Sequence, residues 1–272
     1  MRERATCSNL RSRATGSLSV GLAEPLRRVE LPALESFSVT LTDPDALAGL
    51  LASPAPPTLR ALDVTVGWYD LAALPALYRS PWCAGLTSLT LRCSGFRTPE
   101  DAAAALDLPA LPSLRALSLR CPVPAAALTG ALSGGAVESL RISVMEPGGA
   151  RALAVSDGFA GLKELHVASG RTDSDEFAAL VTSPRAAALQ GLAWGCGAVG
   201  PAGLRALLDA AICARLVALS LQTTADVDDA LKARLFENPR TPRLWTLTGV
   251  GFVAAPKSVR GAMRTRVAPA RD

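Results

Sequence analysis

The chain has 272 residues, of which 49% are hydrophobic, 4% are aromatic and 19% are charged, and its formal net charge is +4. This length suits one large domain or two small ones, and the low aromatic content requires a mainly aliphatic core. A nucleic-acid-binding protein usually carries a stronger basic excess gathered on one face, so the mild charge disfavours nucleic acid as a partner. No apolar run reaches the roughly 18 residues of a membrane span, so we expect no membrane association.

The N-terminal segment is basic but has no apolar run of about 7–15 residues, so we expect no secretory signal. An Arg- and Ser-rich organelle transit peptide is the alternative. The six cysteines contain no C-x-x-C pair. We therefore expect reduced thiols in the cytoplasm, and we interpret residues 1–14 as an N-terminal tail or cap.

A six-residue template, apolar-x-x-apolar-x-apolar, recurs along the chain with a mean period of about 25 residues. A degraded first copy begins at Thr15, and a degraded last copy begins at Leu244. The full copies, in chain order, are LESFSV (34–39), LRALDV (59–64), LTSLTL (86–91), LRALSL (114–119), VESLRI (137–142), LKELHV (162–167), LQGLAW (189–194) and LVALSL (216–221). Each copy alternates apolar with small or polar residues, which predicts a half-buried strand.

Segments between the copies have the apolar spacing of helices. They are residues 43–53, 98–108, 173–183, 199–211 and 226–236. Several begin with a capping residue, a proline or acids, as helix starts do. A strand and a helix in each unit predict an α/β fold with a parallel sheet and helices outside it, in which every unit stacks on its neighbours.

These nine or ten copies resemble the repeats of leucine-rich repeat proteins. The resemblance implies a solenoid, or horseshoe, with its sheet on the concave side and its helices on the convex side, over residues 15–255. Residues 256–272 are then a C-terminal tail. The family pattern usually continues to an Asn three residues after the last apolar position, where this chain has mostly small or turn-forming residues such as Gly67 and Gly170. The chain therefore resembles irregular, bacterial-like repeats that lack the Asn ladder.

Alternate residues of each predicted strand point away from the core, and most of these are small and polar. The candidate binding residues on this face are Asp63, Arg92, Arg120, Arg141, Glu164 and His166. The three arginines and the histidine come from four consecutive copies, so we expect one basic stripe roughly 15 Å long, partly neutralised by Glu164. Such a stripe suits an acidic protein segment or a phosphate-bearing ligand. The alternative, given equal weight, is that an Arg-rich composition scattered these residues there.

Gly195, Gly197 and Gly200 have the G-x-G-x-x-G spacing of a dinucleotide-binding turn. Such a site also needs an acidic residue about 20 positions later, at the end of the next strand. The next predicted strand, LVALSLQTT, carries no acid. We therefore interpret the glycines as a turn of the repeat, with Cys196 pointing inward and Pro201 opening a helix, and we expect no cofactor.

Three cysteines, Cys93, Cys121 and Cys196, occupy an inward position that is mostly apolar in the other copies, so we interpret them as small core residues. Cys93 and Cys121 come from neighbouring copies, and an oxidation-linked disulfide between them is a less favoured alternative. Cys83 and Cys213 also fall at apolar positions. We expect packing rather than metal binding from all five.

Two acidic clusters, residues 173–176 and 226–229, fall where helices are predicted to begin. Neither has the glycine or the final Glu of a calcium-binding EF-hand loop. Acids favour the N-terminal end of a helix, so we predict caps rather than metal sites.

Catalysis finds little support, because His166 is the only histidine and no G-x-S-x-G or P-loop pattern is present. Trp68 and Tyr69 are a second candidate anchor, although we expect them to pack under the following helix. We expect a non-catalytic scaffold that recognises another protein on the concave face. The alternatives are a recognition subunit of an enzyme system whose catalytic domain is on another chain, and binding of nucleic acid or a phosphorylated ligand along the arginines.

Overall fold

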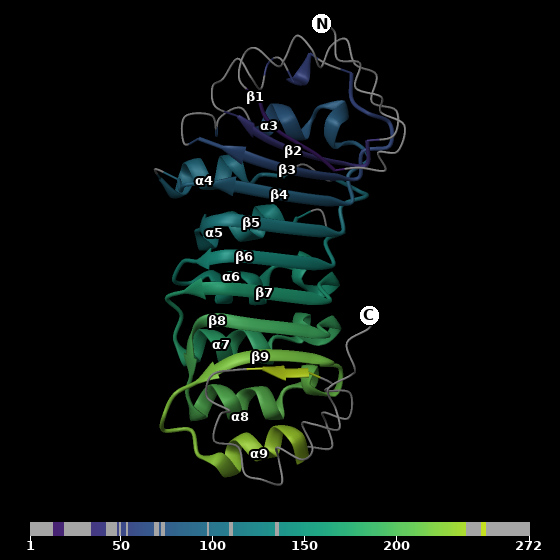
Figure 1. Cartoon of the computed structure of the whole chain (residues 1–272). Coiled ribbons are helices and arrows are strands. Elements are labelled where there is room, and N and C mark those ends of the chain that lie inside the picture. The colour runs from purple at the N-terminus through teal and green to yellow at the C-terminus, as the bar shows by residue number, and fades with distance from the viewer. Residues whose placement is uncertain are drawn as a thin grey trace, which may run out of the picture.

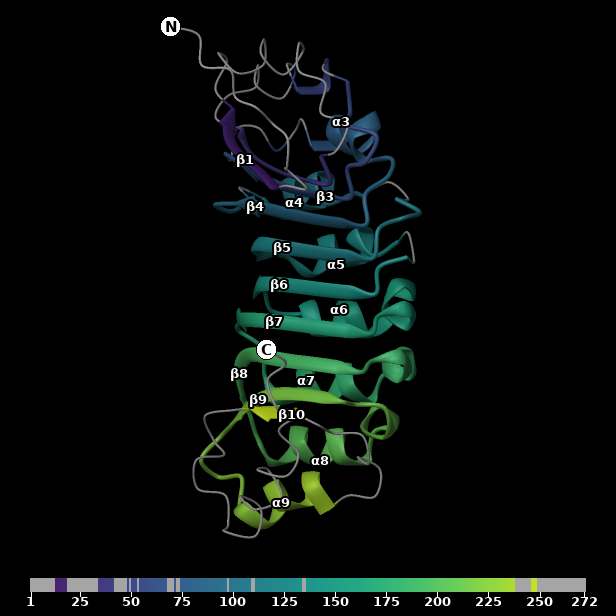
Figure 2. The same ribbon diagram turned by 45° about the vertical axis from the view of Figure 1, so that its right-hand side comes forward.

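The computed structural model describes residues 13–18, 34–41, 48, 50–52, 54–67, 71, 74–96, 98–108, 111–133, 136–237 and 246–248. Within these residues, ten strands form a single sheet in chain order, β1 to β10. Each strand is parallel to the next. Helices lie behind the strands in Figure 1, and the rotated view in Figure 2 separates the two layers.

The strands are β1 (Arg13–Leu18), β2 (Ser36–Leu41), β3 (Ala61–Val66), β4 (Ser88–Cys93), β5 (Ala116–Val123), β6 (Ser139–Met145), β7 (Glu164–Gly170), β8 (Gly191–Val199), β9 (Ala218–Thr223) and β10 (Thr246–Thr248). The helices are α3 (Leu74–Tyr78), α4 (Pro99–Ala105), α5 (Ala125–Ala131), α6 (Gly149–Val155), α7 (Ser174–Thr182), α8 (Pro201–Asp209) and α9 (Asp229–Glu237). Short 3₁₀ turns follow some of them: η2 (Pro81–Cys83), η3 (Asp157–Gly161), η4 (Pro184–Ala188) and η5 (Ala211–Ala214). The predicted α/β fold with a parallel sheet and alternating helices is confirmed, and it is consistent with a solenoid-like repeat.

In seven of the eight full template copies, one leucine is aligned across the sheet, and together these leucines form the centre of the core; the copy at 34–39 has Phe37 at this position. The seven are Leu62, Leu89, Leu117, Leu140, Leu165, Leu192 and Leu219, each paired in register with the next and at most 2% exposed. Because no unit could bury its leucine alone, the aliphatic interior exists only in the stack.

A ladder of backbone hydrogen bonds joins the units at the edge where the strands begin. The carbonyl of the residue just before a strand accepts from two consecutive N–H groups of the next unit, at 2.7 to 3.2 Å. The acceptors are Glu35, Arg60, Thr87, Arg115, Glu138, Lys163 and Gln190. Every step of this ladder fixes the same register, so side chains at equivalent template positions lie side by side.

The predicted caps of the helices are confirmed at two acidic clusters. The Asp173 carboxylate accepts from the Glu176 N–H at 2.7 Å at the start of α7, and the Asp228 carboxylate accepts from the Leu231 N–H at 2.6 Å near the start of α9. Glu176 has a further role, because it is only 8% exposed. Its Oε1 accepts from the Gly148 N–H at 2.6 Å and so links α7 to the start of α6.

The first template copy is displaced from its predicted place. The sequence pattern puts Leu18 level with Phe37, but β1 pairs Leu18 with Leu41. The displacement is four residues. Of the predicted helix over residues 43–53, only four residues are described, whereas α4, α7, α8 and α9 lie within the other predicted segments or end one residue beyond them.

Candidate functional site

The side of the sheet opposite the helices, here called the open face, presents three outward residues per strand. They form three rows that run along the stack. The first row is Ser36, Ala61, Ser88, Ala116, Ser139, Glu164, Gly191 and Ala218; the second is Ser38, Asp63, Thr90, Ser118, Arg141, His166, Ala193 and Ser220. The third contains Thr40, Thr65, Arg92 and Arg120, and all of these outward residues are half-buried or exposed.

The expected basic stripe is broken into two parts by the register. Arg92 and Arg120 are paired in the third row, whereas Arg141 and His166 are paired in the second row. The four residues do come from consecutive strands, β4 to β7, as predicted. The prediction that the four residues form a single basic stripe is therefore wrong. The template already contained this information, because the two pairs occupy different outward positions of their copies.

Arg92 is held by Asp63, which lies on the neighbouring strand in the second row. Its Nε donates to both carboxylate oxygens at 2.9 and 3.2 Å, and its Nη2 donates to Oδ2 at 2.8 Å. Hydrogen bonding to Asp63 raises the pKa of Arg92. Two of the candidate binding residues thus neutralise each other.

Arg120 and Arg141, by contrast, are both exposed, and no hydrogen bond or ion pair holds either guanidinium within the described residues. Arg141 on β6 lies opposite Ser118 on β5, and Ser118 precedes Arg120 by two positions on β5. The two arginines are therefore diagonal neighbours on β5 and β6. Diagonal neighbours on adjacent strands are within reach of long side chains, so both guanidinium groups can engage one anionic group.

A shallow, solvent-open hollow of about 210 Å³ lies next to these arginines, over β6 to β9. Arg141, Glu164 and His166 line one part of it, and the small residues Gly191, Ala193, Ala218 and Ser220 line the other. The Ser139 hydroxyl donates to Glu164 Oε2 at 3.1 Å and holds that carboxylate along the first row. The hollow exists because bulky outward residues on β6 and β7 are followed by small ones on β8 and β9.

Three of the six candidate binding residues, Arg141, Glu164 and His166, therefore line the same hollow. Asp63 and Arg92 lie outside the hollow, and Arg120 lies beside it. The sequence analysis did not select the small floor residues, although it placed them on this face. The signal that could have found them is the step in side-chain size between the copy at 162–167 and the copy at 189–194.

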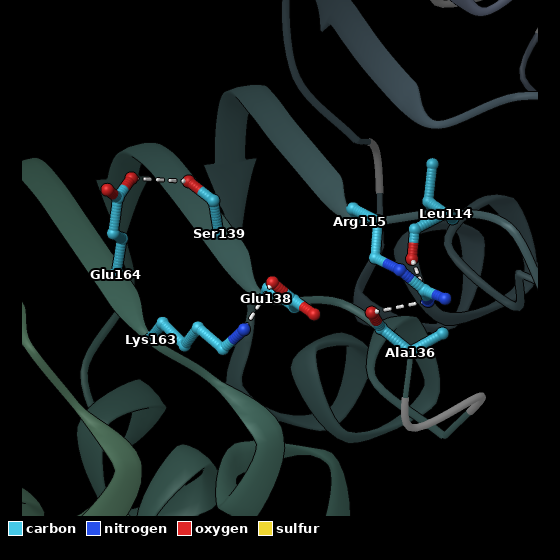
Figure 3. A network of polar contacts seen from close by, with 7 residues as sticks. All are labelled: Leu114, Arg115, Ala136, Glu138, Ser139, Lys163 and Glu164. Atoms are coloured by element: carbon cyan, nitrogen blue, oxygen red, sulfur yellow. Dashed lines mark hydrogen bonds and ion pairs between the residues drawn. The ribbon is translucent and has the colours of Figure 1, made fainter.

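A second polar network follows the strand-start edge and ties the units together (Figure 3). Lys163 Nζ lies 2.7 Å from Glu138 Oε2. The hydrogen bond from Lys163 lowers the pKa of Glu138. Arg115 Nη1 donates to the Ala136 carbonyl of the next unit at 3.1 Å. Because these side chains contact the backbone and one another, we assign this edge a structural role.

The predicted turn is wrong for two of the three glycines, because Gly195 and Gly197 lie within β8, whose pairing with β9 shifts register between Trp194 and Val199. A Cβ on Gly195 would lie 2.1 Å from the Ala168 carbonyl oxygen of the neighbouring strand. Gly197 has a φ of +123°, a backbone angle that residues with a side chain rarely adopt. Gly200 is the N-cap of α8, where its N–H donates to the Ser174 hydroxyl at 3.1 Å. The predicted register, with Cys196 buried and Pro201 opening the helix, is confirmed.

The cysteines within the described residues are free thiols. Cys83, Cys121, Cys196 and Cys213 are at most 3% exposed, as predicted for core packing. Burial raises the pKa of both Cys83 and Cys196 to about 12. Cys93 differs, because it is only half-buried. Cys7 lies outside the described residues.

Some predictions fall on residues that the structure does not describe: the Trp68 and Tyr69 anchor, most of the tail or cap at 1–14, and the tail at 256–272. Among the described residues, no three His, Cys, Asp or Glu side chains are grouped so that they could hold a metal ion. In the same part of the chain, no helix has the length and apolar character needed to cross a bilayer.

Neither a protein-family model nor a curated protein sequence matches the chain. Among solved structures, the chain is similar to Rad7 in the crystal structure of the Rad7 and Elc1 complex in yeast. The TM-score is 0.51 at 14% sequence identity, and the similarity covers 86% of this chain and 67% of that chain. At this level of identity the likeness concerns the fold alone, and it agrees with a repeating α/β solenoid.

Proposed function

We propose that this chain is a leucine-rich repeat protein whose open face, the concave side of the solenoid, binds a segment of another protein without catalysing a reaction. The observation that carries the proposal is the hollow over β6 to β9, bordered by Arg141 and His166 and flanked by Arg120. Rad7 offers weak support, because a chain of similar fold is part of a protein complex. The free thiols support a cytoplasmic location.

The open face suits an extended partner, because its outward residues are mostly small. Flanking rows of Ser, Thr, Ala and Gly leave the approach unobstructed, and the floor at Gly191, Ala193 and Ala218 can accept a bulky side chain. Burial of one large apolar side chain contributes about 1.5–3 kcal/mol to binding, before ordering costs. Such an anchor in a pocket is the usual centre of a binding hot spot.

The charges around the hollow define the partner's chemistry. Arg120 and Arg141 are exposed, and a carboxylate can accept two parallel hydrogen bonds from a guanidinium group. Glu164 lies on the same border of the hollow as Arg141 and His166, in the first row, and would repel a second nearby anion. We therefore propose an acidic protein segment that places one bulky apolar side chain in the hollow and a carboxylate near Arg120 and Arg141.

Nucleic acid and multiply phosphorylated ligands receive less support from this arrangement. Arg92, one of the three arginines in the expected stripe, is already bound to Asp63, and Glu164 is exposed beside the remaining cations. A polyanion needs several unpaired cations along one line, and the described part of the open face places Arg120 and Arg141 on a diagonal. Steep loss of binding with rising salt would favour the polyanion instead.

The proposal is tested by selecting peptides from a random linear 12-residue display library on the purified full chain. We expect selected sequences enriched in Asp or Glu next to one bulky apolar residue. Ala193→Trp fills the hollow and should abolish recovery of these peptides. Ser38→Trp is the matched control, since Ser38 occupies the same row on β2, away from the hollow. Selection of peptides without acidic residues, or equal recovery by both variants, would overturn the proposal.

A further inference from the structure

Two thiols, Cys93 and Cys121, lie at equivalent positions of adjacent strands. Arg92 and Arg120 are paired between β4 and β5, and the next residue of each strand is a cysteine. Side chains at paired positions of parallel strands point to the same side, about 4.8 Å apart. The two thiols are near enough to shift each other's pKa, that of Cys93 downward and that of Cys121 upward.

The spacing of neighbouring strands suits a disulfide. A disulfide requires Cα atoms about 4.4–6.8 Å apart, a range that includes neighbouring strands. Cys93 is the last residue of β4 and is followed by Ser94 and Gly95, with Gly95 at a φ of +147° and no atom near its Cα on the side-chain side. The chain two residues after Cys93 therefore has a glycine-favoured conformation with open space beside it.

Exposure distinguishes Cys93 from the other described cysteines. Cys93 is half-buried, whereas Cys121 is 3% exposed. Cys196 and Cys213 are at most 1% exposed, and each donates to a backbone carbonyl, Cys196 to Ser169 and Cys213 to Leu207. An oxidant from solvent thus reaches Cys93 first, with Cys121 already in place behind it.

We propose that Cys93 and Cys121 form a peroxide-sensitive dithiol that closes into an intramolecular disulfide. The Cys93 thiol first releases its proton, and the thiolate attacks one oxygen of hydrogen peroxide. The O–O bond breaks, Cys93 becomes a sulfenic acid, and the departing hydroxide takes up the released proton to form water. The Cys121 sulfur then attacks the Cys93 sulfur, and the S–O bond breaks. The Cys121 proton and the departing hydroxide form water, so two thiols and one peroxide give one disulfide and two waters.

The acidity of the two thiols supports this assignment of roles. The hydrogen bond from the Cys121 thiol, together with one from the Gly95 backbone, lowers the pKa of Cys93 despite its partial burial. Hydrogen bonding to Cys93 and burial raise the pKa of Cys121. The thiolate is the nucleophile toward peroxide, so Cys93 is the attacking thiol and Cys121 resolves it.

The disulfide would directly follow Arg92 and Arg120 in the chain, at the inward position behind the third row of the open face. This inference does not depend on the proposed function, because it rests on the thiols alone. Its test needs only the purified chain.

The test treats reduced Cys7→Ser chain with a small excess of hydrogen peroxide, blocks remaining thiols, and digests the protein with trypsin without reduction. Cleavage after arginine gives peptides 93–97 and 121–141, each with one cysteine. We expect these two peptides joined, with the intact mass lowered by two hydrogen atoms, while Cys196 reacts at least about tenfold more slowly.

Two variants keep the result interpretable. In Cys121→Ala, Cys93 should accumulate as a sulfenic acid that dimedone traps, and in Cys93→Ala, Cys121 should stay reduced. Cys196→Ala, a substitution at an equivalent inward position, should leave the 93–121 link unchanged. Oxidation of Cys83, Cys196 or Cys213 before Cys93, or overoxidation of wild-type Cys93 without the link, would overturn the proposal.

Discussion

Arg92 on β4 and Asp63 on β3 form a bidentate ion pair that joins the third row of the open face to the second. The shortest contact joins Arg92 Nη2 to Asp63 Oδ2 at 2.8 Å. The side chains remain 39% and 27% exposed, so solvent screens the attraction. This pair withdraws one arginine from the binding surface and concentrates unpaired positive charge at Arg120 and Arg141.

A double-mutant cycle measures what this pair contributes. We expect Asp63→Ala and Arg92→Ala to couple by about 0.2–1 kcal/mol in the free energy of unfolding, because exposed pairs are weak. The coupling should shrink in 1 M salt as screening increases. Urea denaturation of the four proteins at both salt concentrations checks this, and additive single effects at low salt would show that the pair does not form in solution.

The Gly195 position tests the close approach of β8 to β7. Gly195→Ala should lower the free energy of unfolding by about 1–3 kcal/mol, because the new Cβ meets the Ala168 carbonyl oxygen. Gly191→Ala on the same strand is the control, since its Cβ would lie 3.5 Å from Glu164 Cγ. Its effect should stay within about 0.5 kcal/mol. Equal stability of the two variants would contradict the close approach.

The cap of α7 can be tested at a single side chain. Asp173→Ala removes the acceptor of the Glu176 N–H and should cost about 1 kcal/mol of stability. Asp173→Asn retains an oxygen acceptor and should cost much less. Thermal unfolding of both variants is compared with that of Asp175→Ala, which removes a negative charge from the first turn of α7. This comparison separates the capping hydrogen bond from the effect of negative charge near the helix start. A larger loss in Asp175→Ala than in Asp173→Ala would count against the cap.

The Glu138–Lys163 pair predicts a pH dependence of stability. Lys163 holds the pKa of Glu138 below its ordinary value of 4.5, so the folded state favours the charged carboxylate. This contribution is complete above about pH 4.5, the pKa in the unfolded chain, and is lost as pH falls through the lower folded pKa.

We therefore expect the stability difference between wild type and Glu138→Gln to be constant near neutral pH and to shrink as the pH falls below 4.5. Denaturant unfolding between pH 7 and pH 3 measures this difference. In the Lys163→Met background the pH dependence of this difference should be much smaller, with a residual part from Arg115. A difference that grows as the pH falls would have the wrong sign for this pair.

The repeat made most of the fold predictable. The template alone identifies β2 to β9. Apolar residues alternate with small ones in each copy, and a strand is the element that turns all of these apolar residues toward a shared core. The template also predicts burial of Cys121 and Cys196. It places Gly197 at a turn, however, whereas Gly197 lies within β8. The register of the first copy was predicted wrongly. Its strand contains a single large apolar residue, Leu18, so the hydrophobic pattern specifies the register only weakly.

The candidate site was only partly predictable. The template places each candidate residue on the open face, but it says nothing of which side chains bond to one another. The Arg92–Asp63 pair depends on a diagonal reach between rows, and the burial of Glu176 depends on the neighbouring helix start at Gly148. The hollow arises from differences in side-chain size between adjacent strands, which no single copy of the template contains.

The central claim, that Arg120 and Arg141 bind an acidic protein segment on the open face, is tested most directly by isothermal titration calorimetry of a selected acidic peptide. The Arg120→Ala/Arg141→Ala variant is compared with Arg151→Ala/Arg205→Ala, which removes the same charge from exposed positions on α6 and α8. We predict that the first variant weakens binding by at least about tenfold, or 1.4 kcal/mol, while the second leaves it near the wild-type value. Equal affinities for the two variants would contradict the claim.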